Sequence, residues 1–370
     1  MNKLRVLVVE DSLTVRRYLV DTLAADPALE VVGEAEDGQR GFELCQQLRP
    51  DVVTMDMMLP HMTGVGATEH IMAYCPTPIL VVSSSWNRGE LFRTYDALAA
   101  GAVDVLDKPK GDERDADWEH RLVAAVKLVA RIKVITHPRA RLATLAGPPR
   151  TPSRPGLTPL FDQAPPPPLA APAYLPAQRL VAIGVSTGGP GALVDVLGSL
   201  PSDFDIPVLI VLHLSGPFSS AFPEWLEGRS GRKVSFARDR ELLADLAGRA
   251  VLAPPDCHLV VQGRHLRLTH EPERHSCRPS VDVLFESLAT NAGLQITACL
   301  MTGMGKDGAE GLLTLRKAGA ITFAQDEATS IIFGMPREAI LLGAAMRVLP
   351  LPEIGRALAD AARRPSEVPR

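Results

Sequence analysis

The chain has 370 residues, of which 46% are apolar and only 5% aromatic, and this composition favours two α/β domains with cores of Ala, Val and Leu. Its formal net charge of −4 and isoelectric point near 6.2 give no support to nucleic-acid binding. No apolar run reaches the roughly 20 residues that a membrane-spanning helix needs, and Glu10 and Asp11 follow the first apolar run at once. We therefore expect a cytoplasmic protein without direct membrane insertion.

The cysteines do not form a recognisable framework. They stand at positions 45, 75, 257, 277 and 299, which is an odd number without the paired spacing of a zinc site. In a cytoplasmic protein we expect them to be buried and reduced.

The first third of the chain alternates between apolar, strand-like runs and amphipathic segments of helix length. The runs lie at 5–12, 31–32, 51–56, 78–83 and 103–106. The amphipathic segments lie at 12–25, 38–48, 64–74 and 88–100. This alternation predicts a five-stranded parallel sheet with helices on both faces, and the functional residues of such a sheet gather at the carboxyl ends of its strands.

Polar side chains follow the strands of this predicted sheet. Three are carboxylates, and a hydroxyl and an ammonium group complete the set: Glu10, Asp11, Asp56, Ser83 and Lys108. Crowded carboxylates repel one another unless a hard cation binds them, and Mg²⁺ prefers oxygen ligands. Lysine and serine can hold phosphoryl oxygens, which makes Asp56 a candidate phosphoryl acceptor. Each residue taken singly is better explained as a strand end or helix cap, whereas the ordered set favours a site.

Residues 4 to about 130 resemble the receiver domain of two-component response regulators. The matching motifs are Val-Glu-Asp-Ser at 9–12, Met-Asp-x-x-Leu-Pro at 55–60, Val-Ser-Ser at 82–84 and Asp-Lys-Pro at 107–109. The resemblance implies a flavodoxin-like fold and phosphoryl transfer from a histidine kinase to Asp56, with Ser83 and Lys108 binding the phosphoryl group. It also implies a Mg²⁺ site at Glu10, Asp11, Asp56 and the backbone carbonyl of Met58.

Two positions depart from the receiver pattern. The turn after the acceptor reads Met62-Thr63-Gly64 where Met-Asp-Gly is usual. Val105 stands three positions before the lysine, where an aromatic residue is usual. The resemblance therefore does not carry over signalling by an inward-flipping ring.

Prolines crowd residues 135–177, including four in a row at 165–168, and neither a helical nor a strand period is present. This composition predicts a semi-rigid, partly polyproline-II spacer, although a ligand for a proline-binding domain has the same signature. We therefore expect a receiver domain at 1–134, a linker at 135–177 and a second domain at 178–363.

The second domain opens on an apolar run that breaks into Gly184-Val185-Ser186-Thr187-Gly188, after which Pro190 begins an amphipathic pattern. Strong strands are also predicted at 207–212 and 295–300, with helices at 191–200, 219–227, 280–292 and from 309. Short runs at 233–237, 249–253, 258–261 and 265–269 suggest an antiparallel excursion. We expect a doubly wound, mainly parallel α/β sheet, with the histidines of the excursion on its polar surface: His258, His265, His270 and His275.

Three strands of this domain end in Ser186, in His213 and in the loop that holds Asp307. In a doubly wound sheet such ends share one edge, so these side chains can meet. An alcohol becomes a nucleophile when an imidazole takes its proton, and a carboxylate fixes the tautomer of that imidazole. Other interpretations stay open: a packed His213, an N-capping Asp307, or a mononucleotide site at the glycine-rich turn.

Nearly all of this half is similar to the CheB family of chemotaxis protein-glutamate methylesterases. The matching motifs are Ile-Gly-Val-Ser-Thr-Gly-Gly-Pro at 183–190, Ala-Pro-Pro-x-x-His-Leu at 253–259, Arg-Pro-Ser-Val-Asp-Val-Leu-Phe at 278–285, Thr-Gly-Met-Gly-x-Asp-Gly-Ala at 302–309 and Phe-Gly-Met-Pro at 333–336. The resemblance implies Ser186 as nucleophile, His213 as general base and acid, and Asp307 as the residue that orients His213. It implies the backbone N–H of Met304 as an oxyanion donor.

These patterns together lead to the expectation of a phosphorylation-gated serine hydrolase. The resemblance implies γ-methyl esters of glutamate on the cytoplasmic helices of chemoreceptors as substrate, and glutamine deamidation by the same acyl-enzyme route. Mg²⁺ is expected only in the receiver domain, and no metal in the esterase site. The alternative is a receiver-containing non-catalytic adaptor, or a response regulator that acts by binding.

Overall fold

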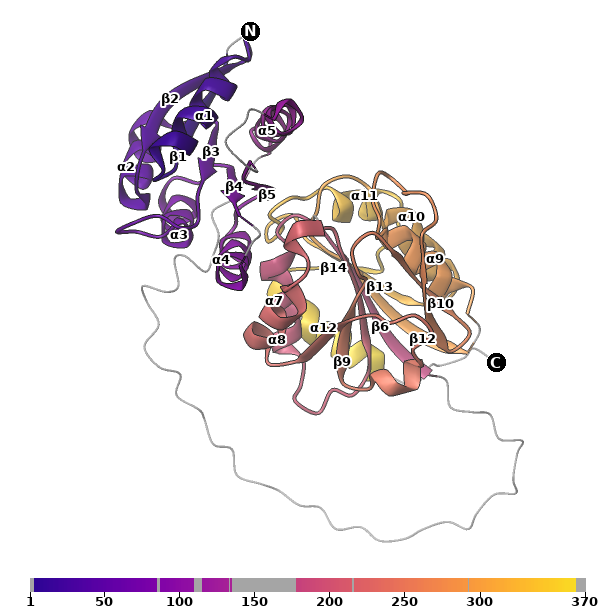
Figure 1. Cartoon of the computed structure of the whole chain (residues 1–370). Helices are drawn as coiled ribbons and strands as arrows, with labels where there is room; N and C mark the ends of the chain where they lie inside the picture. Colours follow the sequence, from indigo (N-terminus) through magenta and orange to yellow (C-terminus); the bar gives the residue numbers. More distant parts are fainter. Residues whose placement is uncertain are drawn as a thin grey trace, which may run out of the picture.

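The computed structural model describes residues 3–84, 87–109, 115–132, 134, 178–214, 216–291 and 293–363. The proline-rich linker predicted at 135–177 lies outside these residues. The described residues form two α/β units, each built around its own parallel sheet (Figure 1).

The N-terminal unit contains the predicted five-stranded, all-parallel sheet. Its strand order is β2-β1-β3-β4-β5. Its strands are β1 (Leu4–Val9), β2 (Leu29–Ala35), β3 (Val52–Met55), β4 (Ile79–Ser83) and β5 (Asp104–Asp107). Its helices are α1 (Leu13–Ala24), α2 (Gly38–Leu48), α3 (Gly64–Tyr74), α4 (Arg88–Ala99) and α5 (Ala116–Val129). The sequence analysis did not single out α5.

Side-chain alternation on β1 shows why helices cover both faces of this sheet. Leu7 and Val9 point into one buried cluster, whereas Val6 and Val8 point into another that contains Trp118 of α5. All four strand residues are fully or almost fully buried. Strands that are apolar on both faces need a layer of helices on each side, which is the parallel α/β arrangement.

The C-terminal unit contains a seven-stranded parallel sheet in the order β14-β13-β12-β6-β7-β9-β8. Its strands are β6 (Gln178–Val185), β7 (Val208–Leu212), β8 (Lys233–Phe236), β9 (Arg249–Leu252), β12 (Leu294–Leu300), β13 (Ile321–Gln325) and β14 (Arg347–Leu349). Its helices are α7 (Gly189–Ser199), α8 (Phe222–Ser230), α9 (Val281–Ala289), α10 (Ala309–Lys317), α11 (Met335–Leu341) and α12 (Leu351–Arg363).

The antiparallel part is smaller than the sequence analysis predicted. Among the strands of the described residues, only β10 (His258–Gln262) and β11 (His265–Thr269) pair in antiparallel fashion, whereas β8 and β9 extend the main sheet as parallel strands. The connection between β8 and β9 contains a short 3₁₀ turn, Leu243–Leu246, whose two leucines are buried. This buried turn returns the chain to the start of β9, so that β9 can pair with β8 in parallel. Short apolar runs in the sequence do not indicate such a connection.

The order of the strands determines where the functional edge lies. The central strand β6 pairs with β7 on one side and with β12 on the other. The chain leaves β6 toward β7 and returns much later to β12, so the sheet changes winding direction beside β6. The carboxyl ends of strands at such a switch point form the usual binding crevice of doubly wound sheets.

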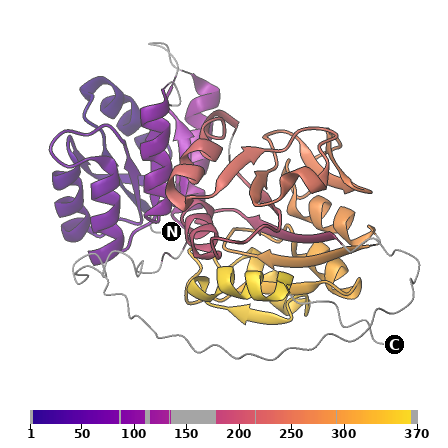
Figure 2. The ribbon, with the colours of Figure 1, turned by 90° about the horizontal axis from the view of Figure 1, so that it is seen from below.

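The two units meet where α4 packs against α7 and α8, an arrangement that Figures 1 and 2 both show. Tyr95 of α4 is fully buried, and its ring centroid lies 5.3 Å from that of Phe222 and 5.5 Å from that of Trp225. Asp96 accepts hydrogen bonds from Trp225 Nε1 at 2.8 Å and Arg229 Nη2 at 2.6 Å. One apolar cluster therefore runs from the first unit into the second.

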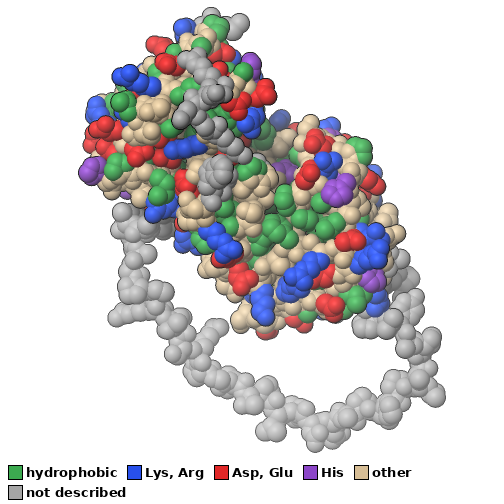
Figure 3. Space-filling view, viewed as in Figure 1, with side chains coloured by type: hydrophobic (Ala, Val, Ile, Leu, Met, Phe, Trp, Pro, Cys, Tyr) green, Lys and Arg blue, Asp and Glu red, His purple; other side chains and the backbone are tan. Residues whose placement is uncertain are grey.

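Acidic and basic side chains are interspersed over the face of the N-terminal unit that Figure 3 presents. Among the described residues, no helix combines the length and the apolar character that crossing a membrane requires.

Candidate functional site

Ser186 lies in the turn that joins the central strand β6 to helix α7. Gly188 ends this turn with a φ of +78°, and the side chain of Ile331 occupies the space that a Cβ would need there. The Ser186 amide donates a hydrogen bond to the Thr302 carbonyl at 3.0 Å, and Thr302 Oγ1 donates to the Thr187 carbonyl at 2.9 Å. The turn is thus anchored to the loop that follows β12.

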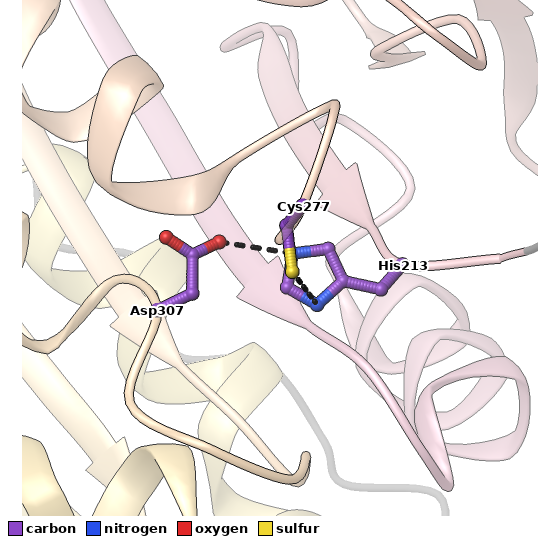
Figure 4. Close-up of side chains that lie close together, drawn as sticks. All are labelled: His213, Cys277 and Asp307. Carbon is purple, nitrogen blue, oxygen red and sulfur yellow. Dashed lines mark hydrogen bonds and ion pairs between the residues drawn. The ribbon is translucent and has the colours of Figure 1, made fainter. Parts of the chain in front are cut away.

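His213 follows β7 and pairs with Asp307. Its amide donates to the carbonyl of Val185, the residue before Ser186, at 3.2 Å. Its Nε2 lies 2.9 Å from Asp307 Oδ2 (Figure 4). The His213 side chain is 16% exposed and that of Asp307 only 3%. The structure therefore brings together the predicted imidazole and carboxylate, with one edge of the imidazole open to solvent.

The start of helix α9 holds the Asp307 carboxylate. Oδ1 accepts hydrogen bonds from Ser280 Oγ at 2.7 Å and from the Asp282 amide at 3.2 Å, and Oδ2 accepts one from the Val281 amide at 2.7 Å. Burial alone raises the pKa of Asp307, but the contacts with His213, Ser280 and Val281 outweigh burial and leave the pKa below its ordinary value. Asp307 is therefore an anion held by a helix N-terminus.

The same ion pair changes the acidity of His213. Burial lowers the pKa of the imidazole, but the hydrogen bonds with Asp307 and Cys277 overcome that effect and raise the pKa to about 9. Because Nε2 faces Asp307, Nδ1 is the ring nitrogen that remains for proton exchange with a hydroxyl. Nδ1 lies 3.8 Å from Cys277 Sγ. Within the described residues, the Ser186 hydroxyl makes no hydrogen bond to His213.

The loop after β12 comes close to Ser186. Gly303 has no room for a side chain, because a Cβ there would lie 2.7 Å from Ser186 Cβ and 2.4 Å from Met335 Sδ. The next residue is Met304, which is 41% exposed. Its amide donates no hydrogen bond within the described part of the chain. The predicted oxyanion donor thus belongs to the loop that contacts Ser186.

The receiver-like cluster forms in the other unit. Lys108 Nζ lies 2.9 Å from Glu10 Oε2 and 3.0 Å from Asp56 Oδ1, and both carboxylates are almost completely buried. Burial, followed by the charge of Asp56, raises the pKa of Glu10 to about 7. Burial also raises the pKa of Asp56 against the opposing effect of Lys108. The buried carboxylates repel one another and have lost hydration, and the single ammonium group of Lys108 does not fully offset these effects.

This cluster fits a hard divalent cation. Carboxylate oxygens of Glu10, Asp11 and Asp56 lie within 4.8 Å of one another. Asp56 Oδ2 is buried and has no hydrogen-bond partner among the described residues, and neither has Ser83 Oγ. Oxygen ligands and an unpartnered carboxylate oxygen are what Mg²⁺ requires, and Ser83 offers a free hydroxyl to a phosphoryl group. Met58 lies beside this cluster, directly after Met57, whose amide donates to Asp56 Oδ1.

Two expectations about individual residues were wrong. His258 is fully buried rather than on a polar surface, and its Nδ1 accepts a hydrogen bond from the Ser280 amide at 3.2 Å. Two of the cysteines, Cys257 and Cys277, are only partly buried, whereas the other three are buried. His258 is buried against the segment between β11 and α9, where its Nε2 lies 3.2 Å from the Pro272 carbonyl.

The sequence analysis did not assign roles to Ser280 and Cys277, which contact the ion pair directly. Ser280 lies within the Arg-Pro-Ser-Val-Asp motif, so the motif was a signal that could have found it. No spacing rule links Cys277 to His213, since the two are 64 positions apart.

Comparisons with known proteins agree with this arrangement. Residues 6–115 match the family described as the response regulator receiver domain, and residues 181–358 match the one described as CheB methylesterase. A protein-glutamate methylesterase/protein-glutamine glutaminase of Nitrosospira multiformis is 41% identical over 362 residues, which cover 96% of each chain. A relative of the same description from Geobacter metallireducens is 42% identical over 97% of this chain and 99% of its own. The CheB methylesterase catalytic domain of Thermotoga maritima, a crystal structure, is 32% identical, with a TM-score of 0.47, and the match covers 49% of this chain and 97% of that one.

Fold and sites thus define a response regulator whose receiver unit precedes an α/β unit with Ser, His and Asp at one sheet edge. The chain belongs to the CheB family of receiver-containing protein-glutamate methylesterases.

Proposed function

We propose that this protein is a phosphorylation-activated serine hydrolase that removes methyl groups from glutamate γ-methyl esters of chemoreceptors and deamidates receptor glutamines. The observation that carries the proposal is the His213–Asp307 pair at 2.9 Å, beside the turn that presents Ser186. The names of the full-length relatives support the substrate class. A non-catalytic adaptor would have no need of a buried, hydrogen-bonded Asp307 behind a partly exposed imidazole.

Acylation begins when Ser186 Oγ attacks the ester carbonyl and His213 Nδ1 takes the hydroxyl proton. Asp307 holds the resulting imidazolium at Nε2 and stabilises its charge. The carbonyl oxygen becomes an oxyanion, toward which the Met304 amide donates. When the tetrahedral intermediate collapses, His213 returns the proton to the departing methoxide and methanol leaves.

Deacylation repeats these steps with water. His213 removes a proton from water, hydroxide attacks the acyl carbonyl, and Ser186 leaves with the proton that His213 gives back. The product is a glutamate carboxylate. A glutamine side chain follows the same route with ammonia as the leaving group, because both substrates pass through a tetrahedral oxyanion.

The receiver unit supplies the control. A histidine kinase donates its phosphoryl group to Asp56, and Glu10, Asp11, Asp56 and the Met58 carbonyl would hold Mg²⁺. The cation would neutralise charge that develops on the phosphoryl oxygens. Lys108 and Ser83 then bind those oxygens through an ammonium group and a hydroxyl. The protein would act in the cytoplasm on the cytoplasmic helices of its receptors, with residues 135–177 as the linker between 1–134 and 178–363.

The contact between the units suggests how phosphorylation changes activity. Ala99 at the end of α4 packs directly on Gly191 of α7, the helix that begins three residues after Ser186. Ile332, whose carbonyl accepts from the Gly303 amide, packs against the apolar cluster around α5 of the receiver. We propose that the unphosphorylated receiver restricts access to the cleft and that an acyl phosphate at Asp56 loosens this contact.

Labelling with a fluorophosphonate tests the assignment of Ser186. We expect the intact protein to be labelled at Ser186 and to release methanol from methylated receptor membranes. Ser186→Ala should abolish both while leaving the fold intact, with turnover reduced by roughly three or more orders of magnitude. An adaptor would show neither labelling nor methanol release, and labelling that persists in His213→Ala would contradict the general-base role.

A further inference from the structure

A thiol lies beside the ring nitrogen that catalysis requires. Cys277 Sγ is 3.8 Å from His213 Nδ1, and Cys277 is only partly buried. Figure 4 shows the thiol pointing toward this nitrogen, while Asp307 lies at the other one. The two side chains and Asp307 form a group whose ligand atoms all lie within 4.8 Å of one another. A thiolate and a neutral imidazole are donors that Zn²⁺ prefers.

The distance between sulfur and nitrogen suits one metal ion held by both. Zinc binds thiolate at about 2.3 Å and imidazole at about 2.0–2.1 Å, so a tetrahedral angle places the two donor atoms about 3.6 Å apart. The observed 3.8 Å therefore needs a movement of about 0.2 Å, which is within the tolerance of a real site.

Asp307 prepares the imidazole for such binding without being a ligand itself. Its Oδ2 accepts a hydrogen bond from Nε2–H at 2.9 Å, which in the neutral ring leaves the lone pair on Nδ1. Metal-binding histidines usually donate their second N–H to a carboxylate in this way, because that fixes the ring and makes it a better donor.

A short turn holds the thiol in place. The amides and carbonyls of Arg274 and Cys277 bond to each other at 2.9 and 3.2 Å. Arg274 is itself fixed to Glu286 at 2.6 Å, and Cys277 Sγ donates to the His275 carbonyl at 3.4 Å. The segment that carries the thiol is therefore held in position by hydrogen bonds and an ion pair.

We propose that His213 Nδ1 and Cys277 Sγ form an inhibitory binding site for a thiophilic divalent cation, with Zn²⁺ as the type ion. Binding forms a Zn–N and a Zn–S bond and involves no change of oxidation state. It releases to solvent the thiol proton and, where the imidazole is protonated, also the proton on Nδ1. Water fills the other two coordination positions of the tetrahedral ion. The ion uses the lone pair that would take the Ser186 proton, so the bound enzyme has no general base. The inhibition rests on the proposed function, whereas the binding does not.

Direct binding is tested with Co²⁺ on the full chain. The variant Cys257→Ser serves as the parent, because Cys257 and His270 form another thiol–imidazole pair, with Sγ 3.7 Å from Nδ1. Within the described residues, no carboxylate bonds to the His270 ring. When Co²⁺ is added to metal-free Cys257→Ser protein, a thiolate-to-cobalt absorption band should appear in the near ultraviolet. Added Zn²⁺ should displace the Co²⁺ and remove this band. The double variant Cys257→Ser/Cys277→Ser should lack it. Absence of the band in the parent, or its persistence in the double variant, overturns the proposal whatever the enzyme's activity.

Inhibition is then measured as the fall in the rate of methanol release as Zn²⁺ is added. The rate of each variant is normalised to its own metal-free rate. Zn²⁺ should inhibit Cys257→Ser as it inhibits the unaltered chain. Cys277→Ser should need at least about tenfold more Zn²⁺, since half of the protein ligands are lost. Equal sensitivity of Cys277→Ser would mean that the imidazole alone binds the metal, and would overturn the two-ligand site.

Discussion

At the scale of single residues, the most informative group is His213. Its pKa of about 9 results from two contacts, with Asp307 and with Cys277, that outweigh its burial. The protonated form predominates below that pH, and in the proposed mechanism only the neutral form accepts the Ser186 proton. We therefore expect esterase activity to follow the charge state of this imidazole.

The first prediction concerns this pH dependence. We expect kcat/KM to rise with pH through the pKa of His213 and to level off only above about 9. Cys277→Ala removes one of the contacts that raise the pKa, so the rising limb should move to lower pH. Cys257→Ala, measured in parallel, should leave the limb in place. A limb that does not move in Cys277→Ala would show that the thiol has no effect on the imidazole.

The second prediction concerns Ser280, which donates to Asp307 at 2.7 Å. A hydrogen bond to a charged group contributes about 1.5–3 kcal/mol, so Ser280→Ala should lower kcat/KM by roughly 10- to 100-fold and shift the pH limb. Ser280→Thr keeps the hydroxyl and should restore most of the rate.

The control for Ser280 lies on the same helix. Ser280 also caps α9, so its loss costs about 1 kcal/mol of stability as well. Ser287 on α9 donates to the Leu284 carbonyl and accepts from the Val261 amide, away from Asp307. Ser287→Ala should therefore lower the melting temperature but not the rate. Equal rates in Ser280→Ala and Ser287→Ala would limit Ser280 to a structural role.

At the scale of elements, helix α4 makes two sets of contacts. It is part of the receiver fold, and it also packs against α7 and α8 of the second unit. Tyr95 is buried between the units, while Asp96 holds Trp225 and Arg229. If phosphorylation of Asp56 controls the esterase unit as proposed, α4 is a receiver element whose contacts with α7 and α8 can transmit the change. The exposed ion pair Arg88–Glu224 at 3.1 Å adds little to this contact, since both side chains are hydrated.

The third prediction follows from this contact. Asp96→Asn removes the charge that holds Arg229, so the unphosphorylated protein should hydrolyse methyl esters severalfold faster, whereas the phosphorylated rate should not change. Asp26→Asn breaks a similar pair, with Lys127 at 2.7 Å, inside the receiver and should leave the basal rate alone. Deletion of residues 1–150 should raise the basal rate further. If neither change raises it, the receiver does not restrict the cleft.

At the scale of the whole molecule, the two sites have different chemical requirements. The cluster of Glu10, Asp11 and Asp56 fits a hard cation, whereas the proposed esterase mechanism uses only side chains and backbone amides. Removing metal ions should therefore separate the two activities.

The fourth prediction makes this separation measurable. A chelator should block phosphoryl transfer to Asp56 but should leave the basal methanol release of the same sample unchanged or slightly higher, as traces of zinc are removed. Added Mg²⁺ should restore phosphorylation, and Asp11→Ala should weaken the Mg²⁺ dependence. Loss of basal esterase activity on chelation would contradict a metal-free esterase mechanism.

The sequence alone determined the number of parallel α/β units, the strand ends that carry Asp56, Ser186, His213 and Asp307, and the family. Apolar periodicity and motifs are local properties, and the carboxyl ends of parallel strands lie at one edge whatever their separation along the chain. Predictions of this kind therefore did not need the folded structure.

Three features of the esterase site became visible only in the folded chain. Nε2 of His213 faces Asp307, the start of α9 binds the carboxylate, and Cys277 lies at the other nitrogen. The structure also shows that β8 and β9 belong to the main sheet and that α4 packs against α7. These features depend on contacts between segments far apart in sequence, whose geometry is set by packing. No local pattern records them, because the residues acquire their neighbours only when the chain folds.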